Sequence, residues 1–128
     1  MNRVLLLEPD SMLAQDIGEI LGGRGYKIDW QVDPQAAMDS ADRAKPSLVI
    51  LDVLLAGRSG VEFLYEFRSY PEWQDVPIVL YSSLSPEEIR LFTNGFDHLG
   101  VAAYLYKPQA NIKQLVDTVL GLLTPAAA

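Results

Sequence analysis

The sequence of 128 residues contains no cysteine, which excludes structural disulfides, thiolate metal sites and catalysis by a thiol. The same absence is typical of a reducing compartment. No apolar stretch approaches the roughly 20 residues that a membrane-spanning helix needs. The apolar run within residues 1–7 stops at Glu8 and is too short for a signal peptide. We therefore expect a cytoplasmic protein that makes no use of a membrane.

Positive charge is also scarce, because 10 Lys and Arg residues face 17 Asp and Glu residues and leave a formal net charge of -7. An acidic protein repels the phosphates of nucleic acids and of anionic lipids, so we expect no direct binding to nucleic acid. With 49% apolar residues, a chain of this length can bury the core of one domain. We expect that domain over residues 1–124, followed by a frayed tail over residues 125–128.

Five short segments rich in apolar residues alternate with segments of helical periodicity. The predicted strands are residues 4–7, 27–31, 48–51, 77–81 and 102–106. The predicted helices begin near Ser11, Pro34, Val61, Pro86 and Ile112, with capping residues such as Asp10, Ser85 and Asn111 before several of them. Strict strand–helix alternation predicts an α/β fold, a doubly wound parallel sheet with helices on both faces.

The order of the strands follows from their burial patterns. Residues 27–31 alternate polar and apolar side chains and belong at or near an edge, whereas the first, third, fourth and fifth predicted strands are continuously apolar and are expected to be buried on both faces. Right-handed crossovers then favour the flavodoxin-like order 2-1-3-4-5. In this order the chain reverses direction between the first and third strands, and ligands bind beyond the carboxyl ends of strands there.

Polar side chains follow four of the predicted strands at this edge. Glu8 follows the first strand and Asp52 the third, and two carboxylates brought together require a proton or a cation between them. Oxygen ligands together with a substrate phosphate are typical of Mg²⁺. The fourth strand delivers the hydroxyl of Ser82 and the fifth the ammonium group of Lys107. This set of groups predicts a site in which an aspartate accepts a phosphoryl group while cations neutralise its oxygens.

The motifs at these strand ends resemble, in order and over nearly the whole chain, a response-regulator receiver domain of two-component signalling. They are residues 5–10 (LLLEPD), 46–52 (PSLVILD), 60–62 (GVE), 76–83 (VPIVLYSS) and 103–108 (AYLYKP). The resemblance implies that Asp52 is the phosphoacceptor and that Lys107 assists it. It also implies an Mg²⁺ ion held by Glu8, Asp52 and the backbone carbonyl of Leu54.

The resemblance further implies a conformational switch. Ser82 matches the switch hydroxyl, and Tyr104 occupies the position of the aromatic residue that turns inward when the hydroxyl moves towards the phosphoryl group. Lys107–Pro108 matches a peptide bond that is usually cis in the family.

The sequence departs from the family pattern in three places. Pro9 stands where a second acidic residue is usual, which puts the affinity for Mg²⁺ in doubt; Asp10 is the candidate replacement ligand, although an N-cap role suits it better. The segment from Ser82 to Lys107 is longer than usual, and residues 94–100 extend the fourth helix or its loop. Leu54 has an apolar side chain that cannot position water, so we expect slow self-dephosphorylation.

The implied function is that of a phosphoacceptor receiver in a phosphorelay. A histidine kinase or phosphotransfer protein donates phosphate to Asp52, and the surface of the fourth helix, fifth strand and fifth helix then changes its affinity for a downstream effector protein. We expect a monomer or a phosphorylation-dependent homodimer, with no output domain in this chain. The chain is not expected to be an enzyme beyond Mg²⁺-dependent self-phosphorylation and dephosphorylation at Asp52.

Other functions share parts of this pattern. Because Pro9 weakens the predicted metal site, a receiver-like module that binds proteins without phosphorylation is the alternative. A flavin mononucleotide carrier is disfavoured, since acids after the first strand would repel its phosphate. A phosphatase of the haloacid dehalogenase type needs a second acid two residues after its aspartate, where this chain has Leu54.

Overall fold

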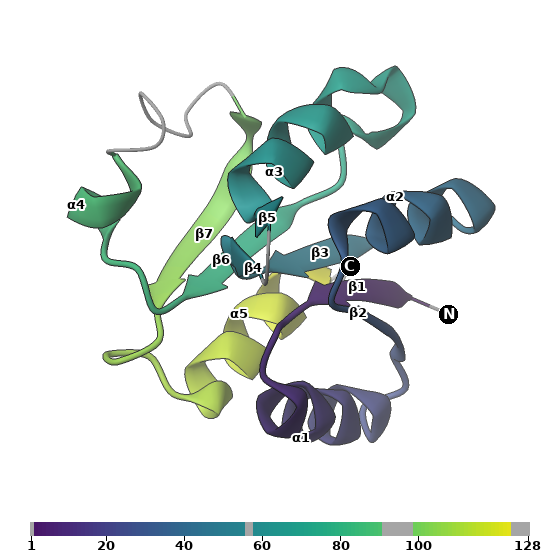
Figure 1. The fold of residues 1–128 in the computed structure, drawn as a ribbon. Helices are drawn as coiled ribbons and strands as arrows, with labels where there is room; N and C mark the ends of the chain where they lie inside the picture. Colours follow the sequence, from purple (N-terminus) through teal and green to yellow (C-terminus); the bar gives the residue numbers. More distant parts are fainter. Residues whose placement is uncertain (1, 56–57, 91–98, 124–128) are drawn as a thin grey trace.

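The computed structural model describes residues 2–55, 58–90 and 99–123. Its main sheet contains five parallel strands in the order β2-β1-β3-β6-β7 (Figure 1). The strands are β1 (Arg3–Leu7), β2 (Lys27–Gln31), β3 (Leu48–Leu51), β6 (Ile78–Ser82) and β7 (Val101–Tyr106). Counted along the chain, this is the order 2-1-3-4-5, so the predicted α/β fold and strand order are confirmed.

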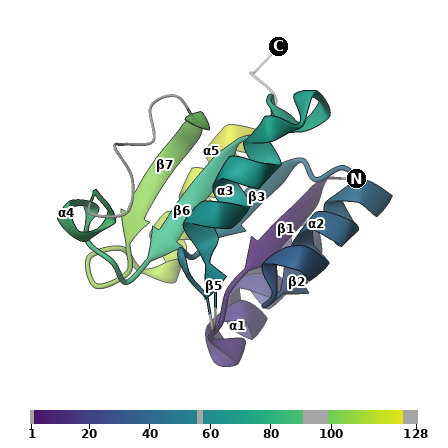
Figure 2. The same ribbon diagram turned by 45° about the horizontal axis from the view of Figure 1, so that its top comes forward.

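Helices cover both faces of the sheet, as Figures 1 and 2 show. On one face lie α1 (Ser11–Gly22) and α5 (Ile112–Leu123), and on the other lie α2 (Pro34–Arg43) and α3 (Gly60–Ser69). A 3₁₀ turn, η1 (Pro71–Trp73), follows α3, and a short α4 (Pro86–Ile89) follows β6. Within the described residues, no helix has the length and apolar character needed to cross a membrane.

The core consists of two apolar clusters separated by the sheet. On β1, Leu5 and Leu7 belong to the cluster under α2 and α3, whereas Val4 and Leu6 belong to the cluster under α1 and α5. This division follows from the two-residue period of a strand, which sends successive side chains to opposite faces. The continuously apolar β1, β3 and β6 are interior strands, and β2, with its alternating pattern, lies at one edge of the sheet. The expectation that the fifth strand is buried on both faces is wrong, because β7 forms the other edge and none of its residues is fully buried.

Local capping determines where the helices begin. The Asp10 carboxylate accepts hydrogen bonds from the backbone N–H groups of Met12 and Leu13 at the start of α1. Ser85 and Glu88 form a reciprocal capping box at the start of α4. These contacts satisfy N–H groups that have no partner within the helix, as the sequence predicted.

The segment before α3 differs from the sequence prediction. Two short strands that are absent from the predicted set, β4 (Leu54–Leu55) and β5 (Arg58–Ser59), pair as a small antiparallel ladder. Leu55 is buried in the cluster under α2 and α3, which holds this ladder against the body of the protein. Strands of two residues are too short to show a periodic pattern, so the sequence carried no signal for them.

The other strands and helices differ from prediction only at their ends. The fourth predicted strand, residues 77–81, is β6 at residues 78–82, and the fifth begins one residue earlier than expected. Most of the segment proposed to extend the fourth helix, together with the predicted tail at residues 125–128, lies outside the described residues. Of that segment the structure describes Leu99, which is buried, and Gly100.

Candidate functional site

The candidate site lies at the carboxyl edge of the sheet, where β1 and β3 end side by side. Leu7 and Leu51 are register partners in these parallel strands. Glu8 and Asp52 follow them directly, and the Asp52 N–H donates to the Leu7 carbonyl at 3.0 Å. The two side chains are only 1% and 2% exposed. The topology thus brings two acids together at an almost dry position.

Lys107 supplies the positive charge between these acids. Its Nζ lies 2.8 Å from Glu8 Oε1 and 2.7 Å from Asp52 Oδ2, and its side chain is 18% exposed. The Lys107 N–H donates to the Ser82 carbonyl at 2.8 Å, which extends the pairing of β6 and β7 past the end of β7 and directs the side chain over the acids. The structure therefore brings together the acids and the lysine that the sequence predicted at three strand ends.

Burial and pairing act in opposite directions on the pKa values of these groups. Burial raises the pKa of Glu8 above its usual value, and hydrogen bonds from Lys107 and from the Asp10 N–H only partly oppose this rise. Burial alone would lower the pKa of Lys107, but its hydrogen bonds to Asp52 and Glu8 raise the pKa overall. The ammonium group is therefore held in its charged form by the two carboxylates.

Hydrogen bonds position the second oxygen of Asp52. Its Oδ1 accepts from the Leu54 N–H at 2.9 Å and from the Ser82 hydroxyl at 2.9 Å. The Ser82 oxygen in turn accepts from the Leu84 N–H at 3.2 Å. Both carboxylate oxygens of Asp52 thus have partners, Lys107 at one and two donors at the other. Lysine, hydroxyl and backbone N–H groups of this kind stabilise added negative charge on an acceptor carboxylate.

Tyr104 continues this chain of hydrogen bonds away from Asp52. Its side chain is half-buried against the core under α2 and α3, and its hydroxyl donates to the Leu84 carbonyl. Burial, together with the negative charge of Asp52, raises the pKa of Tyr104 to about 12. Asp52, Ser82, Leu84 and Tyr104 therefore form one connected path from the site to β7.

Gly60 supports the site in a way that sequence reasoning missed. A Cβ atom at Gly60 would lie 2.6 Å from the Asp52 carbonyl oxygen and 2.6 Å from Val53 Cα. Since these are backbone atoms, no side-chain movement could make room, and only glycine allows α3 to begin so close to the phosphoacceptor candidate. The sequence signal was its place in the GVE motif, which was noted without this role.

Trp30 is a second residue near the site that was absent from the predicted set. Its indole N–H donates to the Glu8 carbonyl at 2.8 Å, although the side chain is 43% exposed. The bond joins the edge strand β2 to the backbone beside the acidic pair. Position was the only available signal, because Trp30 is the register partner of Leu6, close to the end of β1.

Of the predicted metal ligands, Glu8 and Asp52 lie together, whereas Asp10 has another role. Glu8 and Asp52 are adjacent, and two buried carboxylates are the donor type that Mg²⁺ requires. Asp10, the candidate replacement ligand, has its carboxylate engaged in capping α1, and its N–H donates to Glu8 Oε2 at 3.1 Å. Across the described residues, no group of three His, Cys, Asp or Glu side chains is arranged to hold a metal. Any ion at this position therefore relies on Glu8, Asp52 and non-carboxylate oxygens.

One implied feature of the site is wrong. The Lys107–Pro108 peptide bond is trans, as is every peptide bond in the described parts of the chain. The trans form is the more stable one by default for a bond preceding proline. The turn after β7 closes around it, with the Gln109 N–H donating to the Tyr106 carbonyl at 2.9 Å.

The chain belongs to the family of response regulator receiver domains, since the model of that family matches residues 4–120. It is 33% identical over 118 residues to the transcriptional regulatory protein PdtaR of Mycobacterium tuberculosis, covering 91% of this chain and 54% of PdtaR. It is 27% identical over 116 residues to protein-glutamate methylesterase/protein-glutamine glutaminase 1 of Anaeromyxobacter dehalogenans, covering 90% of this chain and 32% of that protein. The chain thus spans about a third to a half of the length of these relatives.

Solved structures agree with this assignment. The chemotaxis protein CheY4 of Vibrio cholerae is 25% identical, with a TM-score of 0.81 over 96% of this chain and 99% of that one. The response regulator TrrA of Thermotoga maritima, solved in complex with Mg²⁺-BeF, is 26% identical, with a TM-score of 0.77 over 96% of this chain and 100% of that one. The family predicted from the strand-end residues is confirmed.

Proposed function

We propose that this chain accepts a phosphoryl group on Asp52 from a histidine kinase or a phosphotransfer protein. The observation that carries the proposal is the pairing of Asp52 with Lys107 at one oxygen and with Ser82 at the other. In the reaction, an Asp52 oxygen attacks the phosphorus of a phosphohistidine, the P–O bond forms as the P–N bond breaks, and imidazole leaves. Lys107 and the Ser82 hydroxyl remain beside the new acyl phosphate and stabilise its charge.

Magnesium fits the donor set and would neutralise the transferred oxygens when bound. Glu8, Asp52 and the Leu54 carbonyl would hold it, and the TrrA complex with Mg²⁺-BeF supports this by analogy. Because Pro9 supplies no carboxylate and the carboxylate of Asp10 caps α1, we propose a lower affinity for Mg²⁺ than a site with one further acid would have. Lys107 already neutralises part of the negative charge of Glu8 and Asp52.

The hydrogen-bonded path from Asp52 to Tyr104 is the proposed switch. A phosphoryl group on Asp52 changes the partner of the Ser82 hydroxyl, and Ser82 is bonded to Leu84, whose carbonyl holds Tyr104. The consequence reaches the surface of α4, β7 and α5, where we place the binding site for a downstream effector protein. This is a two-state equilibrium biased by one added charged group.

Labelling with acetyl phosphate and Mg²⁺, followed by mass spectrometry of the intact protein, tests the phosphoacceptor. Wild type is expected to gain phosphoryl mass and Asp52→Asn to gain none. Asp39→Asn removes an exposed acid on α2 and is the matched control, which should label as wild type does. Equal labelling of Asp52→Asn would reject the assignment. The decay of the label tests Leu54, since we expect a lifetime longer than seconds.

A module that binds proteins without phosphorylation is the second candidate. It is favoured by one observation, namely that Pro9 supplies no carboxylate beside Glu8 and Asp52 while the carboxylate of Asp10 caps α1. Failure of wild type to label under conditions that label another receiver domain would select this function over the first.

A further inference from the structure

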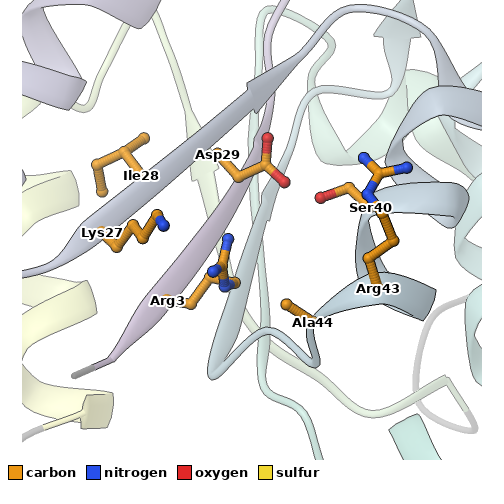
Figure 3. A pocket seen from close by; sticks show the side chains of 7 residues that line it. All are labelled: Arg3, Lys27, Ile28, Asp29, Ser40, Arg43 and Ala44. Atoms are coloured by element: carbon orange, nitrogen blue, oxygen red, sulfur yellow. The ribbon is translucent and has the colours of Figure 1, made fainter.

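A cavity of about 320 Å³ lies between β2 and α2 (Figure 3). It includes Arg3, the first residue of β1, so it lies towards the amino-terminal edge of the sheet, whereas Asp52 follows the carboxyl end of β3. Its lining consists of Arg3, Lys27, Ile28, Asp29, Ser40, Arg43 and Ala44. Neither the sequence motifs nor the proposed phosphorylation uses any of these residues.

The cavity exists because the two elements that face each other do not fill the space between them. Ile28 packs against the core under α1 and α5, so Lys27 and Asp29 are directed to the other face of β2, towards α2. The facing positions are Ser40 on α2 and Ala44 at its C-cap, and both carry small side chains. Polar residues on the strand and small residues on the helix leave a hollow where apolar side chains would normally interdigitate.

Three cationic side chains surround this hollow without ion pairs. Within the described parts of the chain, no salt bridge or side-chain hydrogen bond involves the charged groups of Arg3, Lys27 or Arg43. The carboxylate that shares the cavity, Asp29, accepts instead from Gln31 Nε2 at 2.8 Å. In a protein with only 10 Lys and Arg residues and a net charge of -7, this is a local concentration of positive charge. The cations also outweigh the weak negative end of the α2 dipole.

Ser40 supplies a polar group that is almost fully enclosed. Its side chain is 4% exposed, and its hydroxyl forms no hydrogen bond within the part of the chain that the structure describes. Among the described residues, every fully buried side-chain nitrogen or oxygen atom has a hydrogen-bond partner. Since the Ser40 hydroxyl has none, its oxygen retains some contact with solvent. Figure 3 shows the Ser40 oxygen and the Asp29 carboxylate facing each other across the space between β2 and α2, with Arg43 beside Ser40.

We propose that this cavity binds a small phosphorylated molecule that also carries hydroxyl groups. Arg3, Lys27 and Arg43 would bind the phosphate, since guanidinium and ammonium groups are the usual donors to phosphate oxygens. Asp29 and Ser40 would accept and donate hydrogen bonds at the hydroxyl groups, which an unsubstituted inorganic anion does not have. The volume lies at the lower end of the range for small-molecule sites.

Ribose 5-phosphate is a suitable probe, titrated into ¹⁵N-labelled full chain in EDTA so that the Asp52 site holds no metal. We expect backbone amide shifts at residues 27–29 and 40–44, with weaker binding of inorganic phosphate and none of ribose. Arg43→Gln should weaken binding of ribose 5-phosphate about tenfold or more, the usual effect of losing a charged hydrogen bond. Asp29→Asn should strengthen binding of inorganic phosphate, because it removes a nearby negative charge.

The control is Arg90→Gln, which removes the same charge from an exposed residue at the end of α4, outside the cavity. It should bind the probe as wild type does. The proposal is overturned if the probe shifts no amide at residues 27–29 and 40–44, or if Arg43→Gln and Arg90→Gln have equal effects. Neither result bears on phosphorylation of Asp52, so the two proposals fail separately.

Discussion

Replacing Lys107 by methionine is expected to destabilise the fold more than any other loss of one lysine charge. Methionine keeps most of the apolar stem but removes the ammonium group that contacts both Glu8 and Asp52. The two carboxylates, 1% and 2% exposed, are then left without a counter-charge. Lys107→Met therefore tests whether this contact holds the site together.

The magnitude follows from the burial of the partners. Removing one member of a buried ion pair costs about 3–5 kcal/mol, because an uncompensated charge stays out of water. Since Lys107 is 18% exposed and water can partly replace it, we expect the lower end, about 3 kcal/mol. The deficit should shrink as the pH falls from 7 towards 5, because Glu8, whose pKa is already raised by burial, takes up a proton more readily without Lys107.

Urea unfolding followed by circular dichroism measures this cost. Lys113→Met is the matched control, because it breaks an exposed ion pair with Asp117 on α5 and should cost only about 0.3–0.5 kcal/mol. Millimolar Mg²⁺ should stabilise Lys107→Met more than wild type, since a cation can then bind the uncompensated acids. A loss in Lys107→Met no larger than in Lys113→Met would refute the reasoning, as would a deficit that is unchanged between pH 7 and pH 5.

Three further substitutions test other parts of the site. Glu8→Gln should raise the free energy of unfolding at pH 7, because the raised pKa of Glu8 means that the fold favours its uncharged form. In wild type the stability from protonated Glu8 is complete below pH 4.5 and is lost as the pH rises through the pKa of Glu8 in the folded protein. The difference between variant and wild type in urea unfolding should therefore be smaller at pH 4 than at pH 7. Gly60→Ala should cost about 1–3 kcal/mol by forcing backbone apart, whereas Gly18→Ala, with open space around its Cβ inside α1, should gain about 0.5–1 kcal/mol in the same urea assay. Tyr104→Phe should remove from an absorbance titration the phenol whose pKa is raised to about 12. The stability that the neutral Tyr104 hydroxyl adds to the fold is present below pH 10 and is lost as the pH rises through about 12. A titration identical to that of wild type would contradict the raised pKa of Tyr104.

The sequence predicted those parts of the fold and site that depend on periodicity and strand order. Alternation in residues 27–31 identified one edge strand, but the apolar run of β7 did not reveal that it forms the other edge. Glu8, Asp52, Ser82 and Lys107 could be placed together because parallel strands end at one edge of a sheet. The strand order alone predicted that Lys107 lies near both acids.

Other features depended on contacts that leave no trace in a local pattern. The β4–β5 ladder is too short for a period, and the need for Gly60 arises from backbone atoms of Asp52 and Val53. The cavity between β2 and α2 arises from the combination of small and polar residues on two elements that meet only in the folded chain. The trans bond before Pro108 was missed because the family resemblance, and no property of the residues, supplied that expectation.

The two tryptophans of this chain occupy different environments, one exposed and one buried, so their intrinsic fluorescence can report on two parts of the protein. Trp30 is half-exposed and hydrogen-bonded to the carbonyl of Glu8, so its emission should respond to charge and metal at the site. Trp73 is buried and stacked on Phe67 with a centroid separation of 4.9 Å, so its emission reports only on the integrity of the core. A soluble quencher such as iodide reaches the first and not the second. Site occupancy and unfolding can therefore be followed in one unlabelled sample as separate fluorescence signals.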